Sequence, residues 1–270
     1  IPEWEKQRIV EVARAYPEKS CREVAFHITD KEGYFISESS VYRILKAHDL
    51  VTSPVYTVIS AKDHFEHPTT RTNELWQTDF TYFKVIDWGW YYLLTVLDDY
   101  SRYIIDWSLC KSMKAEDVKK VLDSAIARTG VKHIHVYHRP RLLSDNGPCF
   151  ISSELKDYLS QYAMKHIRTR TYHPMTQGKI ERYHRSMKNL ILLDNYYSPS
   201  ELEARITEWV DHYNNHRYHE AIDNVTPHDR YLGLDRKILK QRKKTKAKTM
   251  RLRKKIYQDL SLKHLMESLN

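Results

Sequence analysis

Apolar residues are concentrated in three consecutive segments in the first half of the chain, as they are in buried β-strands. Residues 76–86, 90–98 and 102–110 are rich in aromatic and β-branched residues, and short polar stretches separate them. Asp87-Trp88-Gly89, between the first two segments, has the composition of a hairpin turn. We therefore expect three consecutive strands, with a hairpin between the first two.

Farther along the chain, apolar residues recur every three or four positions, which is the period of a helix. Residues 114–128 show this pattern, and their inward face is made by Val118, Val121, Leu122 and Ala125. The segments that follow are an extended segment at 131–137, a buried strand at 141–144, a helix at 153–163, a short strand at 165–170, and helices at 176–193 and 199–217. Three strands followed by alternating helices and strands predict an α/β fold, with a mixed sheet flanked by helices.

The first fifty residues predict three short helices that form a small all-α domain. The first helix has apolar residues at roughly helical spacing from Trp4 to Tyr16, and Pro17 ends it. The second begins with a capping-box pattern, Ser20-Cys21-Arg22-Glu23, and Gly33 marks the turn that follows it.

The third of these helices has the features of a DNA recognition helix. Ser37 can cap it, and Val41, Ile44 and Leu45 face inward. Its outward face then carries Ser39, Ser40, Arg43 and Lys46. This suits a helix-turn-helix whose last helix enters the major groove. The alternative is a helical packing domain without DNA contacts, because the Gly33 segment is longer than the turn of the simplest helix-turn-helix proteins.

Changes in pattern divide the chain into four parts. Residues 51–72 lack periodicity and contain Pro54 and Pro68, so we expect a linker there. The predicted organisation is a helix-turn-helix domain at 1–50, the linker at 51–72, an α/β domain at 73–233 and a basic C-terminal tail at 234–270.

The net charge of +9 is concentrated in this tail. Residues 236–255 contain 12 Lys or Arg and no acid, so the rest of the chain has 44 − 12 = 32 basic against 35 acidic residues, a balance of −3. Such clustering indicates a polyanionic partner, and Arg242, Lys243 and Lys244 are the predicted DNA contacts. The tail has helix-compatible apolar residues, and the alternative is a solvated arm without a partner.

Composition also excludes several classes of protein. The chain has no run of eighteen apolar residues and no signal peptide, so we expect neither a membrane span nor export. The three cysteines are far apart and form no C-x-x-C, which argues against a zinc knuckle or a disulfide framework. A cytoplasmic, nucleoid-associated protein fits these observations. The chain begins at Ile1, so we expect a preceding segment.

Three carboxylates have the spacing of a metal site. Asp79 lies in the first predicted strand, Asp145 follows a buried strand, and Glu181 lies one turn into a helix. There are 65 residues between the first two and 35 between the last two. Acids on neighbouring strands and on a following helix can converge, and such a cluster needs cations to offset its mutual repulsion. Carboxylate oxygens with few other fixed ligands suit Mg²⁺ or Mn²⁺.

The helix that carries Glu181 has two distinct faces. Its buried stripe is predicted to contain Ile180, Tyr183, Met187, Leu190 and Ile191. Glu181, Arg185 and Lys188 follow one another at helical spacing on another face. Taken alone, this second face is better explained as solvated surface with an ordinary Glu–Arg pair, and the upstream carboxylates described above change that balance.

The strings around the three acids resemble those of the D-D-E transposases and retroviral integrases. These strings are W-Q-T-D-F-T-Y, S-D-N-G-P and Y-H-P-M-T-Q-G-K-I-E-R, and the similarity continues in Y-N-N-H-R-Y-H. The chain is most similar to the catalytic proteins of the third insertion-sequence family of bacterial transposases, over roughly residues 1–233. The resemblance implies a ribonuclease-H-like fold, with Asp79, Asp145 and Glu181 as catalytic residues that bind two Mg²⁺ ions, for which Mn²⁺ can substitute.

The resemblance also implies an activity and its partners. The protein would bind the ends of an insertion sequence, nick them to give 3′-hydroxyls and join them to target DNA. Holding two ends requires at least a dimer. Besides the helix-turn-helix and the tail, the DNA contacts implied near the acids are Asn146, His173, Gln177, Lys179, Arg185 and Lys188.

Two other functions use the same features. A catalytically inactive DNA-binding regulator would have acids that do not meet, and the complete set of three acids argues against it. A structure-selective nuclease would use the same fold and metals. The predicted DNA-reading helix and the basic tail favour a protein that holds particular DNA ends.

Overall fold

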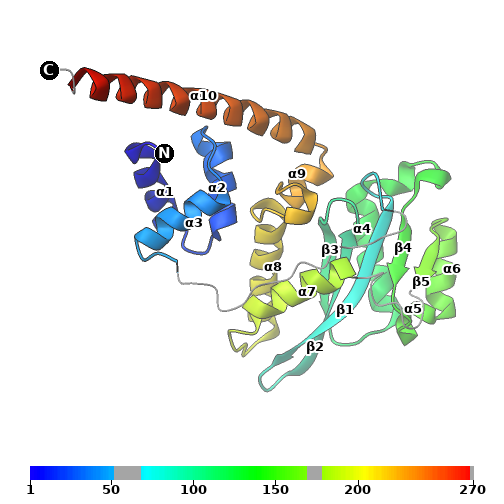
Figure 1. Ribbon diagram of the computed structural model, residues 1–270. Helices are drawn as coiled ribbons and strands as arrows, with labels where there is room; N and C mark the ends of the chain where they lie inside the picture. The colour runs from blue at the N-terminus through cyan, green and yellow to red at the C-terminus, as the bar shows by residue number, and fades with distance from the viewer. Residues whose placement is uncertain (52–67, 169–177, 268–270) are drawn as a thin grey trace. The chain divides into compact units, whose positions relative to one another are not determined.

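The computed structural model describes residues 1–51, 68–168 and 178–267, with side chains to residue 261. The chain forms two compact units (Figure 1). Unit 1 comprises Ile1–Ser60, Tyr218–Val225 and Gly233–Asn270, and unit 2 comprises Ala61–Arg217 and Thr226–Leu232.

Unit 2 is built on the mixed sheet that the sequence predicts. Its five strands are β1 (Leu75–Val85), β2 (Gly89–Asp98), β3 (Ile104–Cys110), β4 (Arg141–Ser144) and β5 (His166–Arg168). They lie in the order β3-β2-β1-β4-β5, with β1–β2 and β2–β3 antiparallel and β1–β4 and β4–β5 parallel. The predicted hairpin turn is present, because Asp87 and Gly89 have the positive φ angles (64° and 87°) that a tight turn requires.

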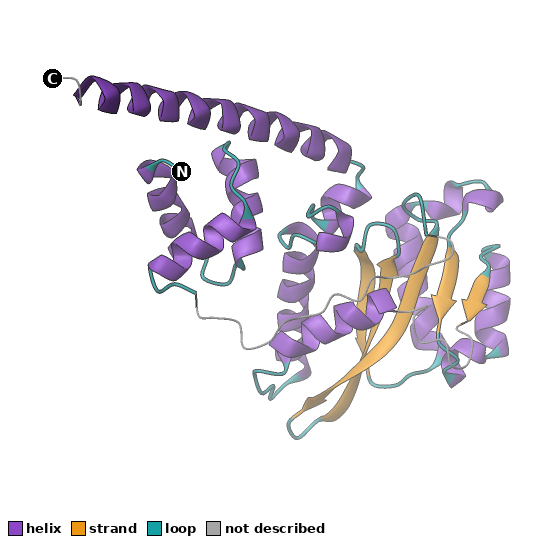
Figure 2. Cartoon of the chain, viewed as in Figure 1, coloured by secondary structure: helices purple, strands orange, loops and turns teal. Residues whose placement is uncertain are grey.

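Helices cover both faces of this sheet (Figure 2). They are α4 (Ala115–Thr129), α5 (Pro148–Ile151), α6 (Ser153–Gln161), α7 (Gly178–Ile191), α8 (Pro199–Asn215) and α9 (Pro227–Tyr231). Trp76 and Leu94 pack against α4 and α6 on one face, whereas Phe83 and Leu93 pack against α7 and α8 on the other. Adjacent strand residues therefore belong to opposite cores, as the alternation of β-structure requires.

One predicted element of unit 2 is wrong. The extended segment expected at 131–137 consists of two 3₁₀ turns, η2 (Val131–His133) and η3 (Val136–His138). Gly130 ends α4 in the left-handed region, with φ 65°, and local hydrogen bonds such as Ile134 N to Val131 O close the turns. Val136 and Tyr137 are exposed, so the apolar residues of this segment do not mark a buried strand.

Unit 1 contains the three predicted N-terminal helices, α1 (Glu3–Ala15), α2 (Cys21–His27) and α3 (Glu38–Ala47), together with the π-helical turn η1 (Ile28–Glu32) and the 3₁₀ turn η5 (Glu220–Ile222). Ser20 and Glu23 form the predicted capping box, and Ser37 caps α3 by accepting from the Ser40 N–H. Val41 and Leu45 of α3 pack into a small core with residues of α1 and α2.

The basic segment forms one helix, α10 (Asp235–Glu267), which belongs to unit 1. Arg242 binds Asp30 (Nη2–Oδ2, 2.6 Å), and Arg253 binds Glu5 (Nη2–Oε2, 2.5 Å). The Phe35 N–H donates to Thr249 Oγ1 at 2.9 Å. The segment that the sequence analysis separates as a tail is thus attached to the N-terminal helices by buried polar contacts. No helix in the described part of the chain has the length and apolar character needed to cross a membrane.

Candidate active site

Asp79 lies in β1, and Asp145 directly follows the adjacent parallel strand β4. The last paired residues of β1 and β4 are Gln77 and Leu143, and each aspartate lies two residues beyond its strand's member of that pair. Because side chains two residues apart point to the same face, and neighbouring strands are about 4.8 Å apart, the two carboxylates lie side by side. These two acids belong to the three-carboxylate site expected from the sequence, which stays a prediction.

The two carboxylates act on each other electrostatically. Burial raises the pKa of Asp145, the Gly147 N–H lowers it, and the negative charge of Asp79 raises it. The Gly147 N–H donates to Asp145 Oδ1 at 2.9 Å, and a Cβ at Gly147 would lie 3.1 Å from the same oxygen. Glycine therefore does more than form a turn here, because a larger residue would press on the carboxylate.

Helix α7 places Glu181 near this pair without completing a three-carboxylate cluster. His184, one turn after Glu181, brings its Nδ1 to 3.5 Å from Asp79 Oδ2. Residues three apart share a side of a helix, so Glu181 lies on the side of α7 nearest Asp79. Its side chain is exposed, and within residues 1–51, 68–168 and 178–267 no three His, Cys, Asp or Glu side chains lie close enough together to hold a metal ion.

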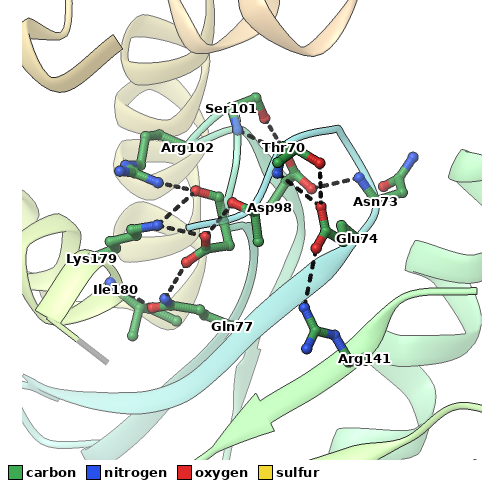
Figure 3. Close-up of polar contacts among 12 residues, drawn as sticks. Thr70, Asn73, Glu74, Gln77, Asp98, Ser101, Arg102, Arg141, Lys179 and Ile180 are labelled. Carbon is green, nitrogen blue, oxygen red and sulfur yellow. Dashed lines mark hydrogen bonds and ion pairs between the residues drawn. The ribbon is translucent and has the colours of Figure 1, made fainter. Parts of the chain in front are cut away.

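A buried polar network attaches the first turn of α7 to the sheet (Figure 3). Gln77 accepts from the Ile180 N–H at 3.2 Å and donates from Nε2 to Asp99 Oδ1 at 2.7 Å. Lys179 Nζ lies 2.5 Å from Asp99 Oδ2, and all three side chains are almost completely buried. Glu181 directly follows the two residues that this network holds.

The chain has an integrase core domain. Residues 69–174 match one family model described as integrase core domain, and residues 162–227 match a second with the same description. The first match includes Asp79 and Asp145, and the second includes Glu181.

This integrase core is similar to that of bacterial transposases. It is 28% identical over 159 residues to the putative transposase InsK for insertion sequence element IS150 of Escherichia coli, covering 58% of this chain and 54% of that protein. It is 26% identical over 164 residues to the transposase for insertion sequence element IS904 of Lactococcus lactis, covering 59% and 62%. The chain thus spans roughly half to three-fifths of the length of these curated relatives.

The fold also agrees with that of a solved retroviral assembly. A chain in the cryo-EM structure of the simian T-cell lymphotropic virus intasome in complex with PP2A regulatory subunit B56 gamma superposes with a TM-score of 0.53. The superposition covers 83% of this chain and 74% of that chain, at 19% identity. The ribonuclease-H-like fold predicted from the sequence is therefore confirmed for the integrase core.

The predicted DNA contacts around the integrase site have different environments. Asn146 is exposed beside Asp145, and Arg185 is exposed on α7. Lys188 is partly buried; burial lowers its pKa, and the charge of Asp79 opposes that shift. His173 and Gln177 lie outside the described residues.

Lys179 is a correction to the predicted DNA contacts. Its side chain is 6% exposed and forms the ion pair with Asp99, so it holds the protein together and does not face a DNA strand. The string Q-G-K-I-E-R implied a DNA contact for Lys179 only through the resemblance to transposases and integrases. The partner, Asp99, is 80 residues away in the sequence, and no local pattern identifies it.

Two residues of this site escaped the sequence analysis. His184 follows Glu181 at a spacing of three, and that spacing on a helix was the signal that could have found it. Gln77 precedes Asp79 by two positions in the first strand, so it shares a face with the aspartate. Its amide connects the sheet to α7, which places it in support of the site.

In unit 1, the predicted recognition face of α3 is accessible. Ser39, Arg43 and Lys46 are exposed, and Ser40 is half-buried. Arg43 lies along the helix, where Nε donates to Ser39 O at 3.3 Å. The helix can therefore present these side chains to a partner without unfolding.

The cations of α10 divide into two groups. Arg242 is another correction, because its side chain is 10% exposed and it binds Asp30 as well as the carbonyls of Asp223 and Asn224. Arg253 is likewise engaged with Glu5. Lys243 and Lys244 are exposed, as are the other eight cations of residues 236–255.

Proposed function

We propose that the chain is a transposase that binds the ends of a DNA element, nicks them to give 3′-hydroxyls and joins those ends to DNA by phosphoryl transfer. The observation that carries the proposal is the pair Asp79 and Asp145, side by side on adjacent strands of an integrase core and coupled electrostatically. The similarity to insertion-sequence transposases supports the same activity.

The residues fit a divalent cation. The donors are carboxylate oxygens, which Mg²⁺ and Mn²⁺ prefer, and a cation would relieve the repulsion between Asp79 and Asp145. We infer that Asp79, Asp145 and Glu181 together hold two ions. When bound, such ions activate the attacking oxygen and stabilise the charge on the leaving oxygen.

The protein's own groups prepare this site. His184 contacts Asp79 and restrains the orientation of its carboxylate. The Gly147 and Phe80 N–H groups donate to Asp145 and Asp79, respectively, and fix one oxygen of each. The remaining carboxylate oxygens can then bind the cations, which agrees with a site made ready before DNA arrives.

Unit 1 would provide DNA binding in two ways. The exposed face of α3 would read base edges, with Arg43 and Lys46 as the main contacts. On α10, Lys237, Lys240, Lys244, Lys248, Arg251 and Lys255 recur at intervals of three or four. They form one stripe on the side of the helix opposite Arg242 and Thr249. A cationic stripe of this kind binds phosphates without reading sequence.

Two DNA ends must be held together for joining, so we propose that at least two copies of the chain assemble on them. The similar chain of the simian T-cell lymphotropic virus intasome was solved as part of a larger complex, which supports assembly here. Sedimentation with and without duplex DNA would measure this assembly.

The test uses labelled duplexes carrying the ends of the mobile element that encodes the chain, with Mg²⁺ or Mn²⁺. Asp79→Asn, Asp145→Asn and Glu181→Gln each retain side-chain shape and remove a metal-binding charge. Each should abolish both nicking and joining while leaving DNA binding largely intact. Glu203→Gln, which neutralises an exposed acid on α8, is the matched control and should react normally.

The outcomes separate the alternatives. Near-normal joining by any of the three variants would remove that residue from the catalytic set. Cleavage without joining in the unmodified protein would indicate a nuclease. Binding of the ends with neither reaction, in the presence of either metal, would indicate a regulator.

A further inference from the structure

The two strands of the β1–β2 hairpin expose two large aromatic side chains, in addition to Trp88 in the turn. Tyr82 is 56% exposed and Trp90 is 53% exposed, although both lie in regular strands. Their rings contact each other edge to face, with centroids 5.4 Å apart and planes at 78°. Single exposed aromatics are common on protein surfaces, but two in contact form a continuous apolar patch, which is typical of an interaction surface.

Strand pairing explains why these two rings share a face. Tyr82 pairs with Tyr92 and Lys84 pairs with Trp90, so Tyr82 and Trp90 are diagonal neighbours. Phe83, which follows Tyr82, pairs with Tyr91, which follows Trp90, and both point to the opposite face and are buried there. The hairpin therefore commits one face to the core and leaves the other to solvent.

A cation is fixed on this aromatic patch. Lys188 of α7 places its Nζ 4.3 Å from the centroid of the Tyr82 ring, close enough for a cation–π contact. Asp79 also acts electrostatically on Lys188, so the lysine lies within electrostatic reach of one of the two carboxylates. Tyr82 is three residues from Asp79 on β1, about 10 Å along the strand, and this odd spacing places the two side chains on opposite faces of β1. Lys188 of α7 is the residue that acts on both.

We propose that Tyr82 and Trp90 form a stacking platform for an unpaired nucleobase of the DNA strand that enters the site. Aromatic side chains beside cations bind single-stranded nucleic acid in this way, since every base has a face that stacks and each step carries a phosphate. Stacked nucleotides advance about 3.4 Å per step, so the base lies within about three nucleotides of the scissile phosphate. This inference rests on the proposed function, because it takes Asp79 as part of the reacting site.

The charges beside the rings favour DNA over a second copy of the chain. Lys84 is exposed on the same face, and the ammonium group of Lys188 contacts the Tyr82 ring, so both charges beside the aromatic patch are positive. A two-fold contact between identical hairpins would bring these cations against their own copies. A nucleotide instead brings a phosphate to the lysines and a base to the rings.

The experiment measures base stacking directly, with the full-length protein in EDTA so that no strand is cut. The probes are duplexes of the element end with 2-aminopurine at each of the last positions of either strand. Stacking on the platform should quench its fluorescence at one or two of these positions. Tyr82→Leu and Trp90→Thr should remove the quench and weaken binding of the frayed end by roughly 5- to 150-fold. Tyr82→Phe and Trp90→Phe retain the rings and should restore it.

Tyr137→Leu is the matched control. Tyr137 is 88% exposed in η3, which precedes β4, whereas Asp145 follows that strand at its other end. This variant should leave the quench unchanged. Circular dichroism of each hairpin variant checks that the exposed substitution leaves the fold intact.

Three results would overturn the inference. The first is quenching of the 2-aminopurine fluorescence that persists in the double variant carrying Tyr82→Leu and Trp90→Thr. The second is a quench lost equally in Tyr137→Leu. The third is dissociation of a dimer by the hairpin substitutions in sedimentation, which would assign this face to self-association. A normal quench in a protein that fails to nick DNA would refute the proposed function and leave the platform standing as a DNA-binding site.

Discussion

Removing the charge of Asp99 tests whether the buried network holds the start of α7 against the sheet. The side chains of Asp99 and Lys179 are 3% and 6% exposed, and their charged atoms are 2.5 Å apart. Asp99→Asn keeps the shape and one acceptor for Gln77 but removes the buried anion opposite Lys179. Loss of one partner of a buried ion pair costs about 3–5 kcal/mol, because the remaining charge stays desolvated.

Urea unfolding followed by tryptophan fluorescence measures the loss of stability in unit 2, which contains Asp99 and Lys179. Of the six tryptophans, only Trp4 lies in unit 1. With a typical dependence of about 1–3 kcal/mol per molar urea, the midpoint should fall by roughly 1–5 M. Because the network precedes Glu181, nicking should fall in the same variant.

A double-mutant cycle isolates the ion pair from other effects of the substitution. Lys179→Met combined with Asp99→Asn leaves no buried charge at this position. The double variant should be more stable than the sum of the two single losses predicts, by about 1–3 kcal/mol. A cost below about 1 kcal/mol for Asp99→Asn, or additive losses in the cycle, would show that the pair does not hold α7 as the geometry indicates.

Three further predictions concern other parts of the chain. Burial raises the pKa of Asp98 from 3.8 to about 6. Between these pH values the folded state therefore binds a proton more tightly than the unfolded state. The contribution of Asp98 to the free energy of unfolding should fall as pH rises from about 4 to 6. Asp98→Asn should lack this fall in urea titrations at several pH values, and equal pH slopes would contradict the assignment. Arg43→Ala and Lys46→Ala should each reduce discrimination between terminal and random DNA by about 1–3 kcal/mol in competition binding; if discrimination survives both, α3 is not the reader. Lys244→Gln with Lys248→Gln should lower the slope of log affinity against log salt by about 1.8 for both DNAs, measured by anisotropy, and an unchanged slope would mean that this stripe does not bind phosphate.

Substituting exposed lysines of α10 is a cleaner test of DNA binding than deleting the basic segment. Deleting residues 236–270 would remove the cations of α10, but it would also remove Arg253 from Glu5, whose side chain is 1% exposed. Unit 1 would then contain a buried acid without its ion-pair partner. Neutralising exposed lysines changes the charge and leaves the contacts of Arg242 and Arg253 in place.

Much of the integrase core follows from local sequence patterns. Runs of aromatic and β-branched residues from residue 75 onward predict β1, β2 and β3, because such side chains pack well on the pleated, buried surface of a sheet. Ser20 and Ser37 identify two helix starts, because a capping side chain acts within three residues. Local patterns also place Asp79 in a strand and Asp145 just after one, but only the fold shows that β1 and β4 are neighbours.

Tertiary structure alone decided which charged residues face solvent and which hold the fold. Lys179 and Arg242 carry no local mark that distinguishes them from the exposed Arg185 and Lys244. Their partners, Asp99 and Asp30, are 80 and 212 residues away in the sequence. A charged side chain is stable inside a protein only where an opposite charge meets it, and that meeting depends on how distant segments pack.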